Sequence, residues 1–281
     1  ESCALDSIGA KYLRDVEPGE IVVADGAGLR SIRTHCGNPS ALCIFEYIYF
    51  ARPDSVIDGS SVQIARQRAG SFLALEHPVQ AGVVIGVPDS GIDAALGYAR
   101  QSGIPYEVGF IKNKYIGRTF IEPTQADREN KVRIKLNPIS HAVQGKRVVL
   151  IDDSIVRGNT ARAIVGLVRD CGARNVYFAS CSPPLRYPCV YGVDMQTRKE
   201  FVARDRDEEE VALRIGADRV IYQTQENLVK AVRMENPNLG RFCAACFDGN
   251  YITGDVTPEM LQLIEDQRRK ASSGQMELNI T

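Results

Sequence analysis

The sequence predicts an α/β fold built on a doubly wound, mainly parallel sheet. Apolar runs typical of buried strands alternate along the chain with stretches that have a helical period. The clearest example is 148–160 (VVLIDDSIVRGNT), in which an apolar strand leads into two acids and a loop of small and hydroxyl residues. A parallel sheet needs this strand–loop–helix order, because the chain must cross over before it can add the next strand.

Each expected element follows from a local pattern. Short apolar runs bounded by turn residues predict strands, and an apolar period of 3.6 residues predicts helices. Gly103 and Gly172 follow the two clearest helical stretches and are expected to end them. We expect strands at 81–87, 106–112, 148–151, 175–181 and 218–223, helices at 92–101 and 160–170, and a frayed polar tail at 268–275.

The loop after the strand at 148–151 carries the strongest chemical signal. In an open α/β sheet this loop lies at the carboxyl edge, and the next helix offers free N–H groups and a positive dipole end to an anion. Asp152 and Asp153 cannot bind an anion directly, so we expect them to bind ribose hydroxyls or Mg²⁺. Solvated acids at a strand end are the alternative. The residues suited to cradle a monophosphate are Ser154, Arg157, Gly158, Asn159 and Thr160.

Ser90 is expected in the same site. The strands at 81–87 and 148–151 would present their following loops at one edge of the sheet. Ser90 also precedes the expected helix at 92–101, with Asp93 three residues later, so a helix N-cap is the competing explanation.

A long stretch at 113–137 has no strong period and many charges. Loops of this length in compact α/β domains are usually lids or disordered segments. Beside a diphosphate site we expect a basic lid that closes and excludes water, and a plain solvated loop is the alternative. Lys112 directly precedes this stretch, and the basic residues within it are Lys114, Arg118, Arg128, Lys131, Arg133 and Lys135.

Composition narrows the class of protein. The chain has 281 residues, 44% of them hydrophobic, which is enough for a real core, and a net charge of −1. This balance gives no electrostatic case for nucleic acid or an anionic membrane as a partner. With no recognisable leader or apolar span, a cytoplasmic location is expected.

The eight cysteines centre on one CxxC pair, Cys243 and Cys246. A single pair of this kind could hold zinc, form a redox disulfide or belong to an iron–sulfur cluster. Cys43 and Cys189 are isolated in the sequence and are buried thiols on spacing alone. The remaining four also fit buried thiols: Cys3, Cys36, Cys171 and Cys181.

The acid-containing stretch resembles the phosphoribosyl-diphosphate motif of type I phosphoribosyltransferases. Taken with five further motifs, the chain resembles glutamine phosphoribosylpyrophosphate amidotransferases, also called amidophosphoribosyltransferases. That family transfers glutamine-derived ammonia to C1 of phosphoribosyl pyrophosphate, giving 5-phosphoribosylamine and pyrophosphate in the first step of purine nucleotide synthesis. The motifs are LCIFEYIYFARPDSVIDG (42–59), GVPDSGIDAALGYA (86–99), NKYIGRTFI (113–121), IDDSIVRGNT (151–160), SPPLRYPCVYGVDM (182–195) and FCAACFDGNY (242–251).

The resemblance implies roles for particular residues. Asp152 and Asp153 would be catalytic and hold Mg²⁺ with Ser90, while Arg133 and Lys135 would bind substrate. Ile155 and Val156 would join the phosphate loop, so that it runs from Ser154 to Thr160. Asn159 replaces a Thr that is frequent in the family, and a polar residue there still suits the turn. Cys43, Cys189, Cys243 and Cys246 would ligate a structural 4Fe–4S cluster.

The resemblance also implies an organisation and partners. Residues 1–20 resemble the end of a glutaminase domain, 21–256 would form the phosphoribosyltransferase domain with the iron–sulfur site, and 257–281 a C-terminal helix and tail. We therefore expect this chain to use free ammonia and not glutamine. The expected partners are phosphoribosyl pyrophosphate, ammonia or glutamine through the glutaminase domain, purine nucleotides as feedback inhibitors, and further copies in a homo-oligomer. A purine-salvage phosphoribosyltransferase and a non-catalytic phosphosugar-binding regulator are the alternatives.

Overall fold

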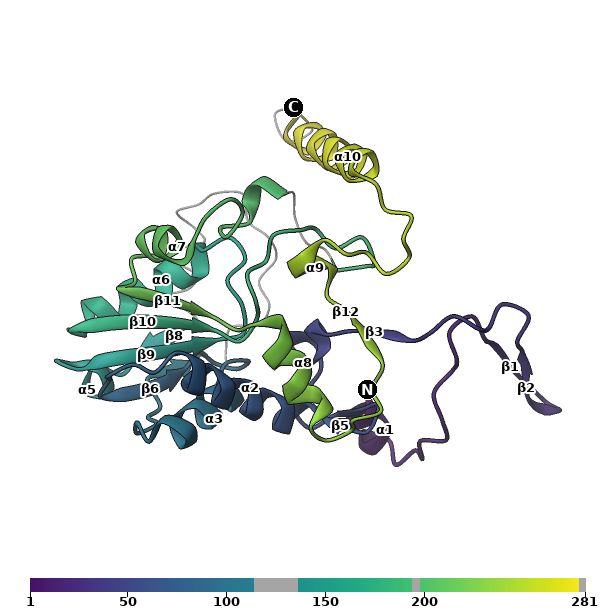
Figure 1. Ribbon diagram of the computed structural model, residues 1–281, viewed down its shortest axis with the longest axis horizontal. Coiled ribbons are helices and arrows are strands. Elements are labelled where there is room, and N and C mark those ends of the chain that lie inside the picture. The colour runs from purple at the N-terminus through teal and green to yellow at the C-terminus, as the bar shows by residue number, and fades with distance from the viewer. Residues whose placement is uncertain (114–135, 194–197, 278–281) are drawn as a thin grey trace.

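The computed structural model describes residues 1–113, 136–193 and 198–277 (Figure 1). Its centre is a four-stranded parallel sheet with the strand order β11-β10-β9-β6. Four of the five expected strands lie in this sheet, each within a few residues of its predicted bounds. They are β6 (Val83–Gly86), β9 (Arg147–Asp152), β10 (Asn175–Ser180) and β11 (Arg219–Tyr222).

Helices cover both faces of the sheet, as Figure 1 shows. Because successive side chains of a strand point to opposite faces, Val148 and Leu150 pack into one apolar core and Val149 and Ile151 into the other. The first core is closed by α6 (Asn159–Asp170) and α7 (Glu208–Ile215), and the second by α2 (Val62–Glu76) and α3 (Ile92–Ser102). The prediction of a doubly wound sheet is therefore confirmed.

The connections that follow β6 and β9 lie on opposite faces of the sheet. The chain leaves β6 through α3 on one face, whereas it leaves β9 through α6 on the opposite face. In open α/β sheets the loops diverge at such a point and leave a crevice outside the carboxyl ends of the strands. The loops after β6 and β9 therefore flank the place where a ligand is expected.

The strand expected at 106–112 is divided in two. Tyr106 forms an isolated parallel bridge with Val84 of β6, whereas β7 (Phe110–Lys112) pairs antiparallel with β8 (Leu136–Pro138). Gly109 separates the two pieces, and a Cβ there would lie 2.4 Å from the side chain of Ile85. The sequence did not predict this change of partner, because it depends on a strand from beyond the long loop.

A second group of short elements packs beside the sheet. β3 (Ala41–Cys43) pairs in parallel with β12 (Arg241–Cys243), which brings together segments about 200 residues apart. An apolar cluster that includes Ile44, Leu228 and Phe247 joins this pair to the π-helix η1 (Glu46–Phe50), α8 (Gln225–Arg233) and α9 (Ala245–Asp248). The antiparallel pair of β4 (Val56–Ile57) and β5 (Ser60–Ser61) is tied to α8, because the hydroxyl of Ser60 donates to the carbonyl of Val232 at 2.9 Å.

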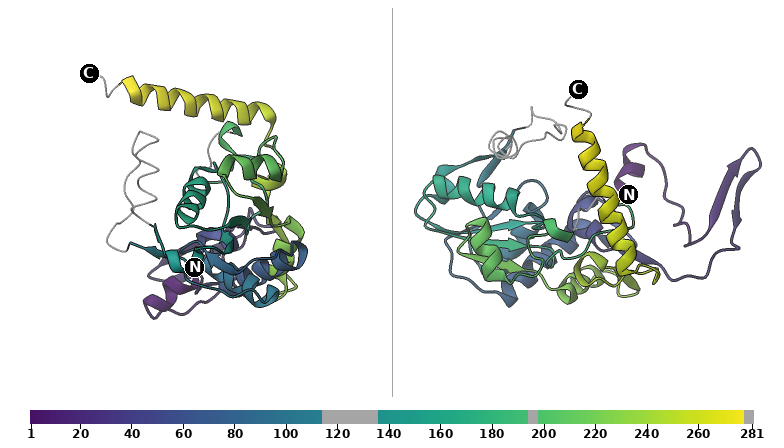
Figure 2. Two further views of the ribbon diagram at one scale, coloured as in Figure 1. Left: turned by 90° about the vertical axis from the view of Figure 1, so that its left-hand side faces the viewer. Right: turned by 90° about the horizontal axis from the view of Figure 1, so that it is seen from above.

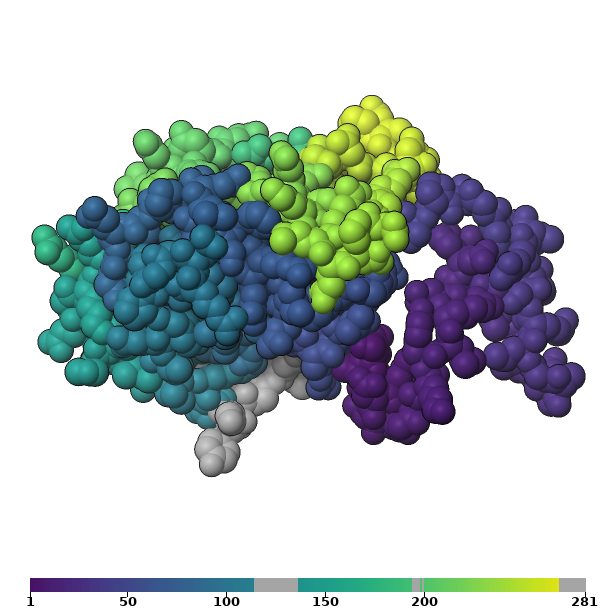
Figure 3. All heavy atoms as spheres, turned by 60° about the horizontal axis from the view of Figure 1, so that its bottom comes forward, coloured from purple at the N-terminus to yellow at the C-terminus, as the bar shows by residue number. Residues whose placement is uncertain are grey.

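The N-terminal segment begins with the short helix α1 (Ser2–Ser7), which is tied to the body because the hydroxyl of Ser2 accepts a hydrogen bond of 2.8 Å from the N–H of Val56. A hairpin of β1 (Ile21–Asp25) and β2 (Gly28–Ile32) follows and stands away from the body, as Figure 3 shows. All five residues of β2 are exposed. The hairpin therefore contributes little to the core of the domain.

At the other end of the chain, α10 (Pro258–Glu277) follows α9. Residues 268–275, expected to be a frayed tail, are helical, so that expectation is wrong. Their composition is rich in residues of high helix propensity, which extends the helix begun by the apolar residues before them. Two short elements complete the fold, namely α5 (Ser140–Val143) and the 3₁₀ turn η2 (Arg198–Glu200). Among the described residues, no helix is long and apolar enough to cross a membrane.

Candidate active site

The acid pair lies at the carboxyl edge of the sheet. Asp152 is the last residue of β9, and its Oδ1 accepts a hydrogen bond of 2.9 Å from the N–H of Asp153. The loop after β10 supports the pair from below, because the N–H groups of Cys181 and Ser182 donate to the backbone carbonyls of Asp152 and Asp153 at 2.9 and 2.8 Å. The backbone of both acids is thus held by the neighbouring strand.

Burial of the pair makes its charge costly. Burial raises the pKa of Asp152 well above its ordinary value, and the neighbouring carboxylate of Asp153 raises it further. The pKa of Asp153 is also raised by burial, although hydrogen bonds from Ser154 and Ser90 and the charge of Arg66 oppose the rise. Two neighbouring acids with raised pKa values would be stabilised in their ionised form by a cation or by hydroxyl donors.

Ser90 joins the acid pair, as expected. Its hydroxyl donates to Oδ2 of Asp153, while the hydroxyl of Ser154 donates to Oδ1. The N-cap of α3 is Gly91 and not Ser90, and no described side chain caps that helix. The competing explanation of Ser90 as a helix cap is therefore wrong.

Gly91 allows the loops to come together. A Cβ on Gly91 would lie 2.2 Å from the carbonyl oxygen of Ile151, which is closer than any real Cβ contact. The N–H of Val87 donates to the same oxygen at 2.8 Å. Only a glycine at this position lets the loop after β6 approach the end of β9.

The segment from Ser154 to Thr160, which we call the phosphate loop, is anchored by its apolar residues. Ile155 is buried in the core beneath α6 and α7, and the carbonyl of Val156 accepts a hydrogen bond of 2.8 Å from Val202. Their side chains do not face a ligand, so any contribution from them to binding comes from the backbone. Gly158 has a φ of 82°, a left-handed conformation that favours glycine.

The phosphate loop ends at an open helix N-terminus. No described side chain caps α6, and Asn159 and Thr160 at its start are exposed. By contrast, side chains cap α2, α7 and α8, whose caps are Ser61, Asp207 and Thr224. The free N–H groups of α6 are thus available to an anion.

Among the basic residues expected near the substrate, Arg157 and Lys112 form ion pairs with acids of the protein, and the others lie outside the described residues. The guanidinium of Arg157 pairs with Glu200 at 3.4 Å. Lys112 pairs with Asp89, which lies in the loop that precedes Ser90. Arg133, Lys135 and most of the expected lid lie outside the described residues.

Arg66 is a charged neighbour that sequence reasoning missed. It is buried in α2, and its guanidinium donates to the carbonyls of Tyr47 and Ala51 at 2.9 and 2.8 Å. Its charge lies near enough to Asp153 to lower the pKa of that acid. The sequence signal that could have identified Arg66 is an arginine among the small apolar residues that form the buried face of α2.

Comparison with known proteins agrees with this geometry. The family model described as a phosphoribosyl transferase domain matches residues 62–182, which include both acids and the phosphate loop. The amidophosphoribosyltransferases of Bacillus subtilis and Archaeoglobus fulgidus are 49% and 48% identical to the chain over 255 and 251 residues. This chain is a homologue of the amidophosphoribosyltransferases. These matches cover about 90% of the chain but only 53% and 55% of the two relatives.

Solved structures of this homologous group have the same fold. Glutamine phosphoribosylpyrophosphate amidotransferase from B. subtilis, complexed with ADP and GMP, has a TM-score of 0.81 and 49% identity, covering 90% of this chain and 56% of that one. A structure described as the allosteric regulatory enzyme of purine biosynthesis gives the same TM-score at 48% identity, with 90% and 54% covered. The type I phosphoribosyltransferase fold of this amidophosphoribosyltransferase homologue is confirmed.

Four cysteines of the homologue gather in its second group of elements. Cys43 and Cys243 are register partners in the β3–β12 pair, while Cys189 and Cys246 belong with Cys43 to one apolar cluster. Burial raises the pKa of the Cys246 thiol, and the neighbouring Cys43, Cys243 and Cys189 raise it further. Burial likewise raises the pKa of Cys43, to about 11.

These thiols do not form a site for a single ion. Among the described residues, no three His, Cys, Asp or Glu side chains are placed to hold one metal ion. A zinc ion would need its thiolates about 3.8 Å apart, from a Zn–S distance of about 2.3 Å in a tetrahedron. All eight cysteines are free, and Cys181 lies beside the acid pair instead of with this group.

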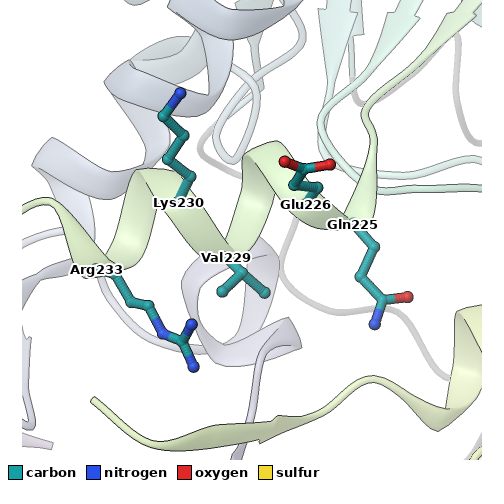
Figure 4. A pocket seen from close by; sticks show the side chains of 5 residues that line it. All are labelled: Gln225, Glu226, Val229, Lys230 and Arg233. Carbon is teal, nitrogen blue, oxygen red and sulfur yellow. The ribbon is translucent and has the colours of Figure 1, made fainter. Parts of the chain in front are cut away.

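A further hollow lies along α8, away from the acids. Figure 4 shows the five side chains of α8 that line it. Two of its cations are already engaged, because Lys230 lies over the ring of Phe72 and Arg233 donates to the carbonyl of Gly240. The lining residues of this hollow are Gln225, Glu226, Val229, Lys230 and Arg233.

Proposed function

We propose that this chain carries the phosphoribosyl-transfer site of an amidophosphoribosyltransferase, which joins ammonia to C1 of phosphoribosyl pyrophosphate and releases pyrophosphate. The observation that carries the proposal is the juxtaposition of a buried and a half-buried acid, Asp152 and Asp153, with an uncapped helix N-terminus in the crevice between β6 and β9. The acid pair suits a sugar and a cation, and the helix N-terminus suits a phosphate. The proposal is supported by the homology to enzymes of that name.

The phosphate loop would bind the 5′-phosphate of the substrate. The N–H groups at the start of α6 point at the loop, and the helix dipole favours negative charge there. Thr160 adds an exposed hydroxyl donor at one end of the loop, whereas Ser154 at the other end would exchange its bond to Asp153 for one to the phosphate. Because Ile155 and Val156 are anchored in apolar clusters, these donors are held in place before the ligand arrives.

Asp152 and Asp153 would bind the ribose ring and its metal. Mg²⁺ is commonly held by one or two carboxylates together with substrate phosphates, so two acids without a third ligand fit this ion. Ser90, on the β6 side of the crevice, orients Asp153 through its hydroxyl. When bound, Mg²⁺ would neutralise charge on the departing pyrophosphate.

The ionised acids would also stabilise the transition state. As pyrophosphate leaves C1, positive charge develops on the sugar, and fixed carboxylates near that charge lower the barrier. Their raised pKa values mean that substrate and metal bind more strongly as the pH rises, because binding requires the ionised form. Ammonia carries its own lone pair, so no strong general base is needed.

We also propose that Cys43, Cys189, Cys243 and Cys246 ligate an iron–sulfur cluster. The four thiols are neighbours from three distant segments, and burial raises the pKa of Cys43, Cys243 and Cys246, as expected of thiols that need a cationic partner to ionise. Thiolates that bind different iron atoms lie farther apart than those that share one ion, which suits this arrangement better than zinc. Such a cluster would tie β3, β12 and the loop at 182–193 together.

The partners of the longer relatives are proposals for this chain as well. A glutaminase domain would supply ammonia, and purine nucleotides would bind as feedback inhibitors. The B. subtilis relative was solved with ADP and GMP, which supports the second of these. Assembly into a homo-oligomer is proposed from the same homology.

An assay of pyrophosphate release tests the proposal. The protein is incubated with phosphoribosyl pyrophosphate and Mg²⁺, together with ammonia or with adenine, guanine or hypoxanthine. Release that depends on ammonia supports the proposal. Release only with a purine base would identify a salvage-type enzyme, and binding without release in either case would identify a regulator.

A further inference from the structure

The segment from Arg198 to Ala203 forms a support for the phosphate loop. The N–H of Val202 donates to the carbonyl of Val156 at 2.8 Å. The side chain of Val202 also lies where it would contact a Cβ on Gly158, at 3.2 Å. Phe201, Val202 and Ala203 are all buried. The position of the phosphate loop thus depends on this supporting segment.

The same segment provides an acid that faces the one arginine of the loop. The carboxylate of Glu200 lies 3.4 Å from the guanidinium of Arg157, and both side chains are partly exposed. Arg157 is therefore neutralised by the protein itself when no ligand is bound. A phosphate that arrives at the start of α6 has to compete with Glu200 for this cation.

The C-terminal helix holds the supporting segment from the other side. Glu265 of α10 accepts three hydrogen bonds from Arg198, from Nε at 2.8 Å, from the backbone N–H at 2.9 Å and from Nη2 at 3.5 Å. Glu265 is only 6% exposed, and Leu261 beside it on the helix is buried as well. Figure 2 shows α10 extending beyond the body, so that its N-terminal half makes the attachment. Arg198 and Glu200 belong to one 3₁₀ turn, η2.

We propose that Glu200 and Glu265 are positioning residues of the phosphate loop. Glu200 holds Arg157 away from the phosphate, and Glu265 fixes the turn that places Glu200. This inference rests on the proposed function, since it assumes that the phosphate loop binds a phosphate monoester. The docking of α10 then sets how strongly the loop binds its phosphate, although α10 does not contact the ligand.

Binding of ribose 5-phosphate by calorimetry tests the inference, with the full chain and its Glu200→Gln, Glu265→Gln and Arg157→Gln variants. Glu200→Gln removes the competing charge, and we expect its Kd to fall about two- to fivefold, because an exposed ion pair of this kind is weak. Glu265→Gln should change the Kd in the same direction by a smaller factor. In the Arg157→Gln background both effects should disappear.

The double variants separate this mechanism from a general charge effect. Removing an acid near a dianion would tighten binding with or without Arg157, so an equal gain in the Arg157→Gln background would overturn the inference. An unchanged Kd in Glu200→Gln would also overturn it, whereas a wild-type chain that does not bind ribose 5-phosphate would overturn the proposed function itself. Glu259→Gln is the matched control, because Glu259 lies on α10 and its side chain hydrogen-bonds to Thr257 and not to Arg198. It should leave the Kd unchanged, and thermal unfolding should show that all variants are folded.

Discussion

Replacing Asp153 by asparagine separates the chemical role of the acid pair from its structural role. The Asp153→Asn substitution keeps the shape of the side chain and removes one negative charge at the carboxyl edge of the sheet. One of the two hydroxyl bonds, from Ser154 or Ser90, can be kept as it is. The other hydroxyl can rotate and accept from the new amide, because a serine hydroxyl is both a donor and an acceptor.

The expected effect on stability is small. A hydrogen bond to a charged group contributes about 1.5–3 kcal/mol and a neutral one about 0.5–1.5 kcal/mol, so the two bonds together lose about 2 kcal/mol. Against this loss, the substitution removes a buried charge whose pKa is raised by burial. We therefore expect the free energy of unfolding to change by less than about 2 kcal/mol, which is a few degrees in Tm.

The expected effect on catalysis is much larger. Losing one preorganised charge that stabilises the transition state costs about 3 kcal/mol, or a factor of roughly 100 to 1000 in rate. Ammonia-dependent pyrophosphate release measures this factor, and calorimetric unfolding of the same preparation measures the stability. An activity within about threefold of wild type in both Asp153→Asn and Asp152→Asn would refute the assignment of the acids.

Asp218→Asn is the matched control at the opposite edge of the sheet. Asp218 accepts hydrogen bonds from the N–H of Val176 at 2.7 Å and from Arg169 at 2.8 Å, near the amino ends of β10 and β11. Burial raises the pKa of Asp218, but these hydrogen bonds outweigh it and the net pKa is lowered. This variant should lose stability at neutral pH and keep its activity, which is the reverse of the Asp153→Asn pattern.

Three further results are expected. Asp152→Asn should raise the Tm at neutral pH in the absence of metal, because a folded-state pKa above the unfolded value of about 3.9 makes ionisation destabilising. Differential scanning calorimetry should show that this gain in Tm disappears as the pH falls toward that value. A gain that persists at low pH would contradict this cause. Gly91→Ala should cost about 1–3 kcal/mol and lower phosphosugar affinity, measured by unfolding and calorimetry, because its Cβ would overlap the carbonyl of Ile151; full affinity would show that the two loops can move apart freely. Serine at Cys43, Cys189, Cys243 or Cys246 should give colourless, poorly soluble protein by absorbance and iron analysis, whereas Cys171→Ser should be mild; colourless wild-type protein with stoichiometric zinc after anaerobic purification would contradict the cluster.

Much of the sheet could be predicted because its strands are local apolar runs. β6, β9, β10 and β11 are each buried on both faces, so they appear in the sequence as continuous apolar stretches between turn residues. The acid pair could be placed as well, because it stands where the apolar run of β9 ends and precedes a glycine-containing turn and a helix. These features depend only on neighbouring residues in the chain.

Features that depend on distant segments could not be predicted from local patterns. β7 lies within the expected strand at 106–112, but its antiparallel pairing with β8 depends on a segment beyond the long loop. The pairing of Cys43 with Cys243 likewise exists only in the fold. The roles of Arg66 and Glu200 were missed for the same reason, since each faces the site from a different element. Ser90 was ambiguous in the sequence, and only the structure shows that its hydroxyl bonds to Asp153 instead of capping the following helix.

The most direct test of the central claim is a calorimetric titration of phosphoribosyl pyrophosphate into the protein with and without Mg²⁺. If Asp152 and Asp153 hold the metal-bound sugar and the start of α6 holds its phosphate, binding should saturate at one site per chain with Mg²⁺ and weaken at least tenfold without it. The Asp152→Asn and Asp153→Asn variants should lose this dependence on the metal. Equal affinity with and without Mg²⁺, unchanged by both substitutions, would contradict the assignment of the carboxyl edge of β9 as the active site.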